Sequence, residues 1–280
     1  MVSANVAHVV FLTGDTSFSK SLAKSLPDRV FHSMHLGDAS PESAKRFVLR
    51  HISDDPSGAA NEKAGGGLDD SIQVLGGRLT DLEFLARRIR AGEAPRQAVA
   101  EIVETSANEI LKLYLLPFLD EPGRKKRTWT PEQAWLLVKM LADDEQLRYN
   151  QVLIHDLFRS AGEEALQGIE HAELITVVSK NGRPWSIKPG RPVYQAAFRR
   201  LLLDKALRAR MDYNSLATLV KLETARVKDA EDELEKIAPL PNPPKGRAAY
   251  LVAKITKSQG KIEAHEKVME KLKKVLKEEY

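Results

Sequence analysis

The carboxy-terminal segment constrains the fold most strongly, because two apolar stripes at helical spacing flank a segment that no helix can contain. That segment is PLPNPPKG, at residues 239–246. Each stripe advances in steps of three and four residues or their multiples, so each predicts a helix that packs along one face. Residues 212–280 are therefore predicted to form an antiparallel helical hairpin. Its predicted seam comprises Leu216, Val220, Val227, Ala230, Leu234, Ile237, Leu251, Ile255, Ile262, Met269, Leu272 and Leu276.

A second signal lies at Asn181-Gly182, a dipeptide typical of the tight turn of a β-hairpin. Strand-like runs at 174–179 and 185–188 flank this turn. Three helices and a β-hairpin predict a winged-helix-like domain over residues 128–211. The predicted helices of this region span residues 130–141, 149–160, 162–168 and about 193–210.

The first part of the chain, residues 1–121, combines short strands with helices. Residues 8–12 form an apolar run that ends in Thr-Gly-Asp, as a buried strand does when it enters a turn. Because this strand has no earlier element to pair with, we expect the natural protein to extend upstream. The remaining predicted elements are a helix at 17–25, a strand at 30–36, and helices at 41–52, at 68–89 with a break at Gly76-Gly77, and at 95–116. The predicted fold class is mainly α with a few short strands.

Several kinds of site are excluded or unsupported by the sequence. There is no cysteine, so disulfides, thiolate metal sites and cysteine nucleophiles are excluded. The seven histidines form no zinc-binding spacing, and no metal site is predicted. No apolar stretch reaches the roughly 18–20 residues of a membrane span. The 43 basic and 39 acidic residues leave a small positive excess, which is weak support for a polyanionic partner.

The stretches VVFLTGD, SLPDRVF, HLGDASPESAKRF and LGGRLTDLEFLARRI resemble the second half of an NTPase module of the AAA+ or STAND type. This half comprises a partial core with a sensor strand, followed by a helical lid. Together with the winged-helix-like region and the hairpin, these stretches resemble the carboxy-terminal region of the fungal mitochondrial escape protein 2 family. The resemblance covers nearly the whole chain.

The resemblance implies a function that composition does not show. In that family an RNA-recognition motif, a transmembrane helix and the phosphate-binding part of the ATPase precede this region, which faces the intermembrane space. The family maintains the mitochondrial genome and its nucleoids at the inner membrane. We therefore expect an assembly or regulatory region, a homo-oligomer formed through the intact ATPase region, and membrane attachment only through an upstream segment.

Nucleotide chemistry is not expected of this chain alone, because no G-x-x-x-x-G-K-[ST] loop occurs in it. We expect no cofactor in the chain alone; ATP and magnesium are candidate cofactors of the intact protein only. Four residues remain nucleotide-sensing candidates by resemblance. Thr13 and Asp15 match the end of the sensor strand, and Arg29 matches an arginine finger. Arg78 lies at the start of a lid helix and matches a second sensor. The alternatives are turn capping for the first pair and solvent or ion-pair contacts for the two arginines.

Basic residues around the predicted wing suggest a second function, nucleic-acid binding. The candidates are Arg124, Lys125, Lys126, Arg127, Lys180, Arg183, Lys188 and Arg191, with Trp185 at their centre. A solvated linker explains the first four equally well, and Trp185 also fits a core position. Winged-helix domains contact proteins as well as nucleic acids, so two hypotheses stand. One is an assembly module whose hairpin packs mainly within the chain, since Ser258 and His265 interrupt its second stripe; the other is a nucleic-acid-binding module.

Overall fold

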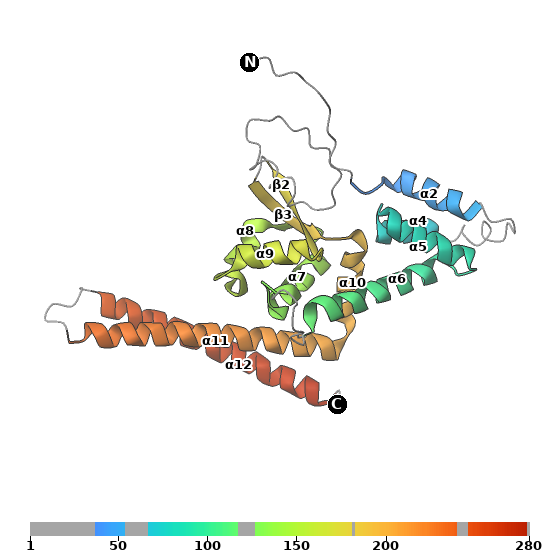
Figure 1. Cartoon of the computed structure of the whole chain (residues 1–280). Coiled ribbons are helices and arrows are strands. Elements are labelled where there is room, and N and C mark those ends of the chain that lie inside the picture. Colours follow the sequence, from blue (N-terminus) through green and yellow to red (C-terminus); the bar gives the residue numbers. More distant parts are fainter. Residues whose placement is uncertain (1–36, 54–66, 117–126, 181–182, 240–245, 279–280) are drawn as a thin grey trace, which may run out of the picture. The chain divides into compact units, whose positions relative to one another are not determined.

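The computed structural model describes residues 37–53, 67–116, 127–180, 183–239 and 246–278 (Figure 1). The chain divides into two units, residues 1–38 and residues 39–280, and every element described below belongs to the second. The elements predicted at 8–12, 17–25 and 30–36 lie outside the described residues. The candidates Thr13, Asp15 and Arg29 lie outside them as well.

Within the described residues, the first part of the second unit comprises four helices and a π-helical turn. They are α2 (Pro41–Ser53), α4 (Leu68–Leu75), α5 (Leu79–Arg90), α6 (Pro95–Ile110) and the turn η1 (Leu111–Leu115). The N–H of Ser43 bonds the Ser40 hydroxyl oxygen at 3.3 Å, so the Ser-Pro-Glu sequence begins α2 as predicted. The predicted break at Gly76-Gly77 separates α4 from α5.

Residues 131–189 combine three helices with a small antiparallel sheet. The elements are α7 (Pro131–Asp143), β1 (Leu147–Arg148), α8 (Tyr149–Ile154), the 3-10 turn η2 (Asp156–Phe158), α9 (Gly162–His171), β2 (Ile175–Lys180) and β3 (Arg183–Pro189). A reciprocal capping box between Thr130 and Gln133 begins α7. The sheet order is β1-β3-β2, so the last strand lies between the other two. The predicted β-hairpin is confirmed.

The helix predicted at about 193–210 is divided in the structure. Helix α10 (Pro192–Leu203) ends before Asp204, and α11 (Lys205–Ile237) begins after it. The Asp204 carboxylate accepts a hydrogen bond from the Leu207 N–H at 2.9 Å, which is an N-cap and gives α11 its own start. Helix α11 then runs without a break through residue 212, where the predicted hairpin begins.

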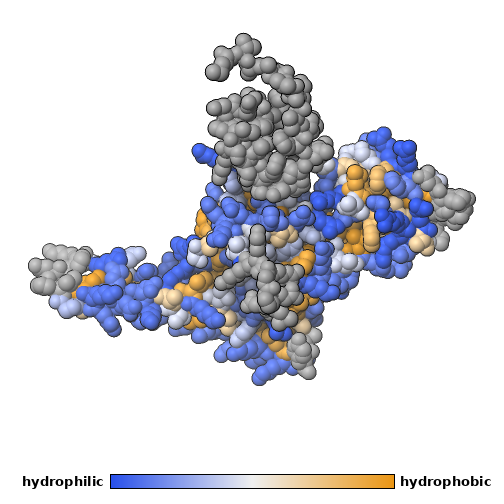
Figure 2. Space-filling view, viewed as in Figure 1, coloured by the Kyte–Doolittle hydropathy of each residue, from blue (hydrophilic) through white to orange (hydrophobic). Residues whose placement is uncertain are grey.

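The predicted helical hairpin is confirmed, since α12 (Arg247–Glu278) returns alongside α11 (Figure 1). Every predicted seam position is buried or half-buried, and so are Ser258 and His265. Hydrophilic side chains dominate the visible face of the two helices (Figure 2). The hairpin thus packs its apolar residues mainly against itself.

One cluster of buried hydrophobic residues connects these parts from α2 to the start of α11. Its largest fully buried side chains include Trp135, Phe158 and Phe198, which come from α7, η2 and α10. The described part of the chain is mainly helical with one small three-stranded sheet, which agrees with the prediction of a mainly α fold with a few short strands.

Candidate functional site

Arg78 lies at the start of α5, where its backbone carbonyl accepts hydrogen bonds from the N–H groups of Asp81 and Leu82 at 3.0 and 3.1 Å. No side chain caps this helix start. The Arg78 side chain is half-buried and forms no ion pair within the described residues. Its guanidinium therefore has no ion-pair partner within the described residues and lies at the positive end of a helix, two features that a phosphate contact would require.

The turn before Arg78 requires its two glycines. Gly76 has φ 65° and ψ −154°, a backbone conformation that only glycine adopts readily. The carbonyl of Gly77 accepts a hydrogen bond from the Ala39 N–H at 2.9 Å, and a Cβ on Gly77 would lie 1.9 Å from the Ala39 carbonyl oxygen. The start of the second unit is thus fixed to the turn that presents Arg78.

Arg191 does not take the role predicted for it. Its guanidinium donates a hydrogen bond to Asp81, a carboxylate that is only 3% exposed, and lies 3.8 Å from Glu109 and 5.3 Å above the Tyr194 ring. Burial alone would lower the pKa of Arg191, but the hydrogen bond and the charge of Asp81 outweigh it, and the pKa is raised. Arg191 therefore joins α5 and α6 to the start of α10 rather than facing a nucleic-acid backbone.

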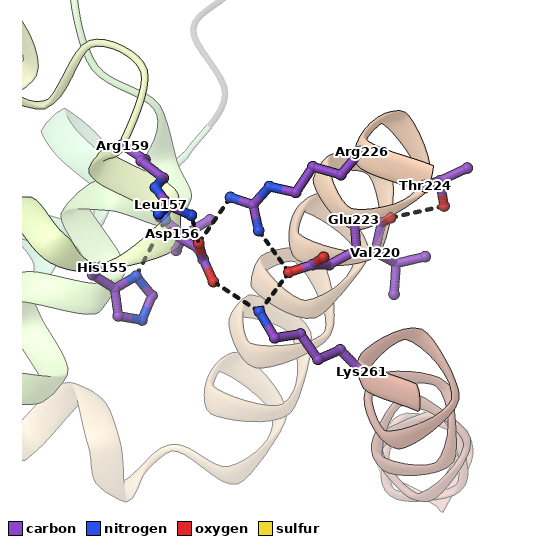
Figure 3. A network of polar contacts seen from close by, with 9 residues as sticks. All are labelled: His155, Asp156, Leu157, Arg159, Val220, Glu223, Thr224, Arg226 and Lys261. Carbon is purple, nitrogen blue, oxygen red and sulfur yellow. Dashed lines mark hydrogen bonds and ion pairs between the residues drawn. The ribbon is translucent and has the colours of Figure 1, made fainter. Parts of the chain in front are cut away.

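A polar network fixes the hairpin to the middle of the second unit (Figure 3). Asp156 in η2 accepts a hydrogen bond from Arg226 of α11 at 2.8 Å, and the other branch of the same guanidinium reaches Glu223 at 2.6 Å. Lys261 of α12 donates to Glu223 at 2.8 Å and lies 3.7 Å from Asp156. Three elements far apart in the sequence are thus joined by alternating charges.

The electrostatics of this network are favourable for its ionised form. The hydrogen bond from Arg226 lowers the pKa of Asp156. Burial alone would raise the pKa of Glu223, which is 3% exposed, but hydrogen bonds from Lys261 and Ser258 outweigh it and the pKa is lowered. The Leu157 N–H donates to Nδ1 of His155 at 3.2 Å and steadies the turn that carries Asp156.

A second polar contact holds the base of α11. Asp212 accepts hydrogen bonds from the Trp135 indole N–H and from the Lys139 ammonium group, both at 2.8 Å. Both donors belong to α7. Because two separate contacts bind α11 to the preceding part of the unit, the direction of the hairpin is set by side-chain chemistry and not only by the chain connection at Asp204.

The β2–β3 hairpin carries the other candidate site, which we call the wing surface and define as Lys180, Arg183, Trp185 and Lys188. All four side chains are exposed, and Trp185 is 52% exposed, so it is not the core residue of the alternative interpretation. The Lys180 ammonium lies 5.2 Å from the Trp185 ring centroid. None of the three basic residues forms an ion pair within the described part of the chain.

Of the four basic residues of the linker, the structure describes only Arg127. Arg124, Lys125 and Lys126 lie outside the described residues. Arg127 donates hydrogen bonds to the carbonyl oxygens of Leu113 and Leu116, where η1 ends, and lies 5.4 Å from the Trp129 ring. A cation bonded to the last carbonyls of a helical segment stabilises its end, so Arg127 is engaged within the chain.

Two further classes of site find no support in the described residues. No group of three histidine, aspartate or glutamate side chains there is arranged to hold a metal ion. Within the same ranges, no helix combines the length and the apolar character needed to span a bilayer.

Comparison with known proteins assigns the family. The profile of the family described as RNA12 protein matches residues 1–240. The chain belongs to the RNA12 family. RNA12-family relatives named mitochondrial escape protein 2 align with all of the chain: 48% identity with that of Phaeosphaeria nodorum, 47% with that of Chaetomium globosum and 44% with that of Aspergillus niger. The predicted resemblance to the mitochondrial escape protein 2 family is thereby confirmed over the whole chain, whereas the resemblance to an NTPase module of the AAA+ or STAND type stays a prediction.

The alignments cover all of this chain but only part of each relative. The chain spans about a third of the length of these curated relatives, namely 36%, 36% and 35%. Helix α12 lies beyond residue 240, where the RNA12 profile match ends, but within the alignments with the relatives. No solved structure matches the chain.

Proposed function

We propose that this chain is the carboxy-terminal assembly and regulatory region of a mitochondrial protein. The names of the RNA12-family relatives, which align along the whole chain, support the mitochondrial assignment. In this proposal the intact protein resides in the inner membrane, is attached through an upstream segment, and presents this region to the intermembrane space. Its role is the maintenance of mitochondrial DNA and of nucleoid organisation.

Residues 128–211 act in this proposal as a winged-helix domain. The element order supports this assignment: a helix, a short strand, two helices and a β-hairpin, with the last strand paired between the other two. Residues 1–121 act as the second half of an AAA+-like core and its helical lid. The turn at Gly76-Gly77 and the uncommitted Arg78 at the following helix start are consistent with a lid that senses nucleotide.

The nucleotide in this proposal is held by the intact protein, with ATP and magnesium bound by upstream residues. Arg78 would then contact the phosphates from the lid, and Thr13, Asp15 and Arg29 stay nucleotide-sensing candidates by resemblance. Assembly is proposed to be a homo-oligomer formed through the intact ATPase region. The chain alone performs no hydrolysis.

The observation that carries the assembly role is the fixed attachment of the α11–α12 hairpin. The Asp156–Arg226–Glu223–Lys261 network and the contacts of Asp212 join the hairpin to two different elements, η2 and α7. A flexible tether needs no such contacts, whereas an arm that must meet another subunit at a defined angle does. The face of this arm that Figure 2 shows is mainly hydrophilic, which favours a contact made by charged and polar groups.

Mass photometry tests this proposal on the chain and on a form extended upstream through the whole ATPase core, each with and without ATP. We expect only the extended form to assemble, and only with ATP. The variant Arg78→Ala should weaken that assembly, whereas Arg90→Ala, at the far end of α5, should not. Equal behaviour of the extended form with and without ATP would remove the nucleotide-dependent part of the proposal.

A further inference from the structure

We propose that the wing surface binds single-stranded nucleic acid, with Trp185 as a stacking platform for a base and the three cations as contacts for phosphates. This inference concerns the β2–β3 hairpin and does not depend on the proposed assembly role. It is carried by the charge of the hairpin, the geometry of Trp185 and the chemistry of α9.

The charge of the hairpin is entirely positive. Residues 175–189 contain Lys180, Arg183 and Lys188 and no aspartate or glutamate. Lys180 and Arg183 are register partners at the end of the hairpin, and Lys188 pairs with Thr176 nearer its base. The strand between Arg183 and Lys188 extends roughly 16 Å at about 3.3 Å per residue. The hairpin thus offers an elongated positive surface with no counter-charge of its own, as a polyanion requires.

Trp185 stands out from the sheet because the strand register shifts at its position. Val178 pairs with Ser186 and Ser179 pairs with Pro184, so Trp185 is an extra residue on β3 without a partner on β2. Such a bulge redirects a side chain, and here it leaves the indole 52% exposed, with the Lys180 ammonium 5.2 Å from the ring centroid. An exposed aromatic ring beside cations is the arrangement on which unpaired bases stack.

Helix α9 makes a single strand a better ligand than a duplex. In helix-turn-helix folds the second helix of the motif enters the major groove, and α9 is the helix that precedes the wing. Its exposed side chains include Glu163 and Glu164, and its sequence GEEALQGIEH contains no lysine or arginine. Two carboxylates at the start of this helix would repel the phosphates that border a groove. A base can stack on Trp185 only if it is unpaired, which selects single strands.

Charge alone would also suit an acidic protein segment, but the aromatic platform favours nucleic acid. Acidic side chains need only the cations, because a base makes better use of the indole face than a carboxylate does. A strand of nucleic acid uses both components, because it presents a flat base and a phosphate in each repeat.

Fluorescence anisotropy with the whole chain tests the proposal, using a labelled oligodeoxythymidylate and a duplex of the same length. We expect the single strand to bind more tightly. Trp185→Ala should weaken its binding roughly 5- to 150-fold, the range for loss of one stacking contact. Between about 50 and 200 mM salt the affinity should fall about 20-fold, as expected for three phosphate contacts. Trp185→Phe should retain most of the binding.

Tyr250→Ala is the matched control, because Tyr250 is another exposed aromatic with a cation nearby. It is 57% exposed and lies 5.2 Å from the Arg247 guanidinium, but Arg247 is paired with Glu233. This control should bind like the unmodified chain, and thermal melting should show that all three variants are folded.

Three results would overturn the proposal. They are equal affinity of Trp185→Ala and the unmodified chain for the single strand, tighter binding of the duplex, and binding of polyglutamate with the same dependence on Trp185. The last result would assign the wing surface to an acidic protein. None of the three bears on assembly, so failure here and failure of the proposed function are distinguishable.

Discussion

Replacing Arg226 with methionine tests whether the polar network anchors the hairpin. Arg226 donates to Asp156 at 2.8 Å and to Glu223 at 2.6 Å, and hydrogen bonds of this charged kind contribute about 1.5–3 kcal/mol each. Methionine keeps an unbranched, apolar stem of similar length but removes both bonds. The substitution therefore acts on the charge network and leaves most of the packing in place.

The cost of Arg226→Met is limited by the partners that remain. Removing one member of a fully buried pair costs about 3–5 kcal/mol because a charge is left uncompensated. Here Lys261 still contacts Glu223 at 2.8 Å, and Asp156 keeps Arg159 at 3.4 Å. Arg226 is itself partly exposed, with 24% of its side chain accessible, which weakens its contribution through solvent screening. We therefore expect a loss of about 2–3 kcal/mol in the free energy of unfolding.

Urea unfolding followed by circular dichroism measures this loss, and hydrogen exchange locates it. Exchange should accelerate in η2 and in the facing part of α11, while the amides of α5 and α6 keep their protection. The matched control is Arg210→Met, because Arg210 is exposed on α11 and forms no ion pair within the described residues; its effect should stay within about 0.5 kcal/mol. Equal stability of the two variants would refute the anchoring role of the network.

Three further outcomes are expected. Gly77→Ala should lower the melting temperature markedly, since the new methyl group would lie 1.9 Å from the Ala39 carbonyl oxygen; Gly260→Ala, in open space within α12, should raise the stability by about 1 kcal/mol. Arg191→Met leaves the buried carboxylate of Asp81 without its guanidinium partner and should cost about 3–5 kcal/mol in chemical denaturation. The pKa values of both carboxylates in the hairpin network are lowered, so their contribution to the free energy of unfolding is present above about pH 4 and is lost as the pH falls through the lower folded-state values. Unfolding measured at constant ionic strength between about pH 5 and pH 3 should show this loss of stability. Arg226→Met should make the stability depend less on pH in this range.

The parts of the fold that rest on local patterns were predictable from the sequence. The two apolar stripes around residues 239–246 predicted the helical hairpin, and the strand-like runs on either side of Asn181-Gly182 predicted the antiparallel pair β2 and β3. The break at Asp204 was missed because apolar residues continue on both sides of it. Its signal was an N-cap residue inside an otherwise helical pattern.

The polar network was missed although one of its members carried a signal. Glu223 lies on the first apolar stripe, between Val220 and Val227, at the spacing where an apolar residue is expected. It faces Ser258, the polar interruption of the second stripe, and their hydrogen bond helps to lower the Glu223 pKa. Polar residues on both stripes of a helical pair indicate a matched layer that fixes the register.

Contacts between distant residues could not be predicted from one sequence. Arg191 and Asp81 are 110 positions apart, and no local pattern relates them. Arg127 belongs to a basic run that is typical of a solvated linker, yet its guanidinium bonds the carbonyls at the end of η1. The exposure of Trp185 depends on a register shift between β2 and β3 that the alternation of side chains does not specify.

A hairpin held in a fixed direction for assembly should make assembly depend on its polar network, and mass photometry of the form extended through the ATPase core, with ATP, measures this dependence. We predict that the unmodified protein and Arg210→Met assemble alike, whereas Arg226→Met assembles more weakly at concentrations where circular dichroism shows it folded. Assembly of Arg226→Met to the same extent as the unmodified protein would show that the fixed direction of the hairpin has no part in assembly.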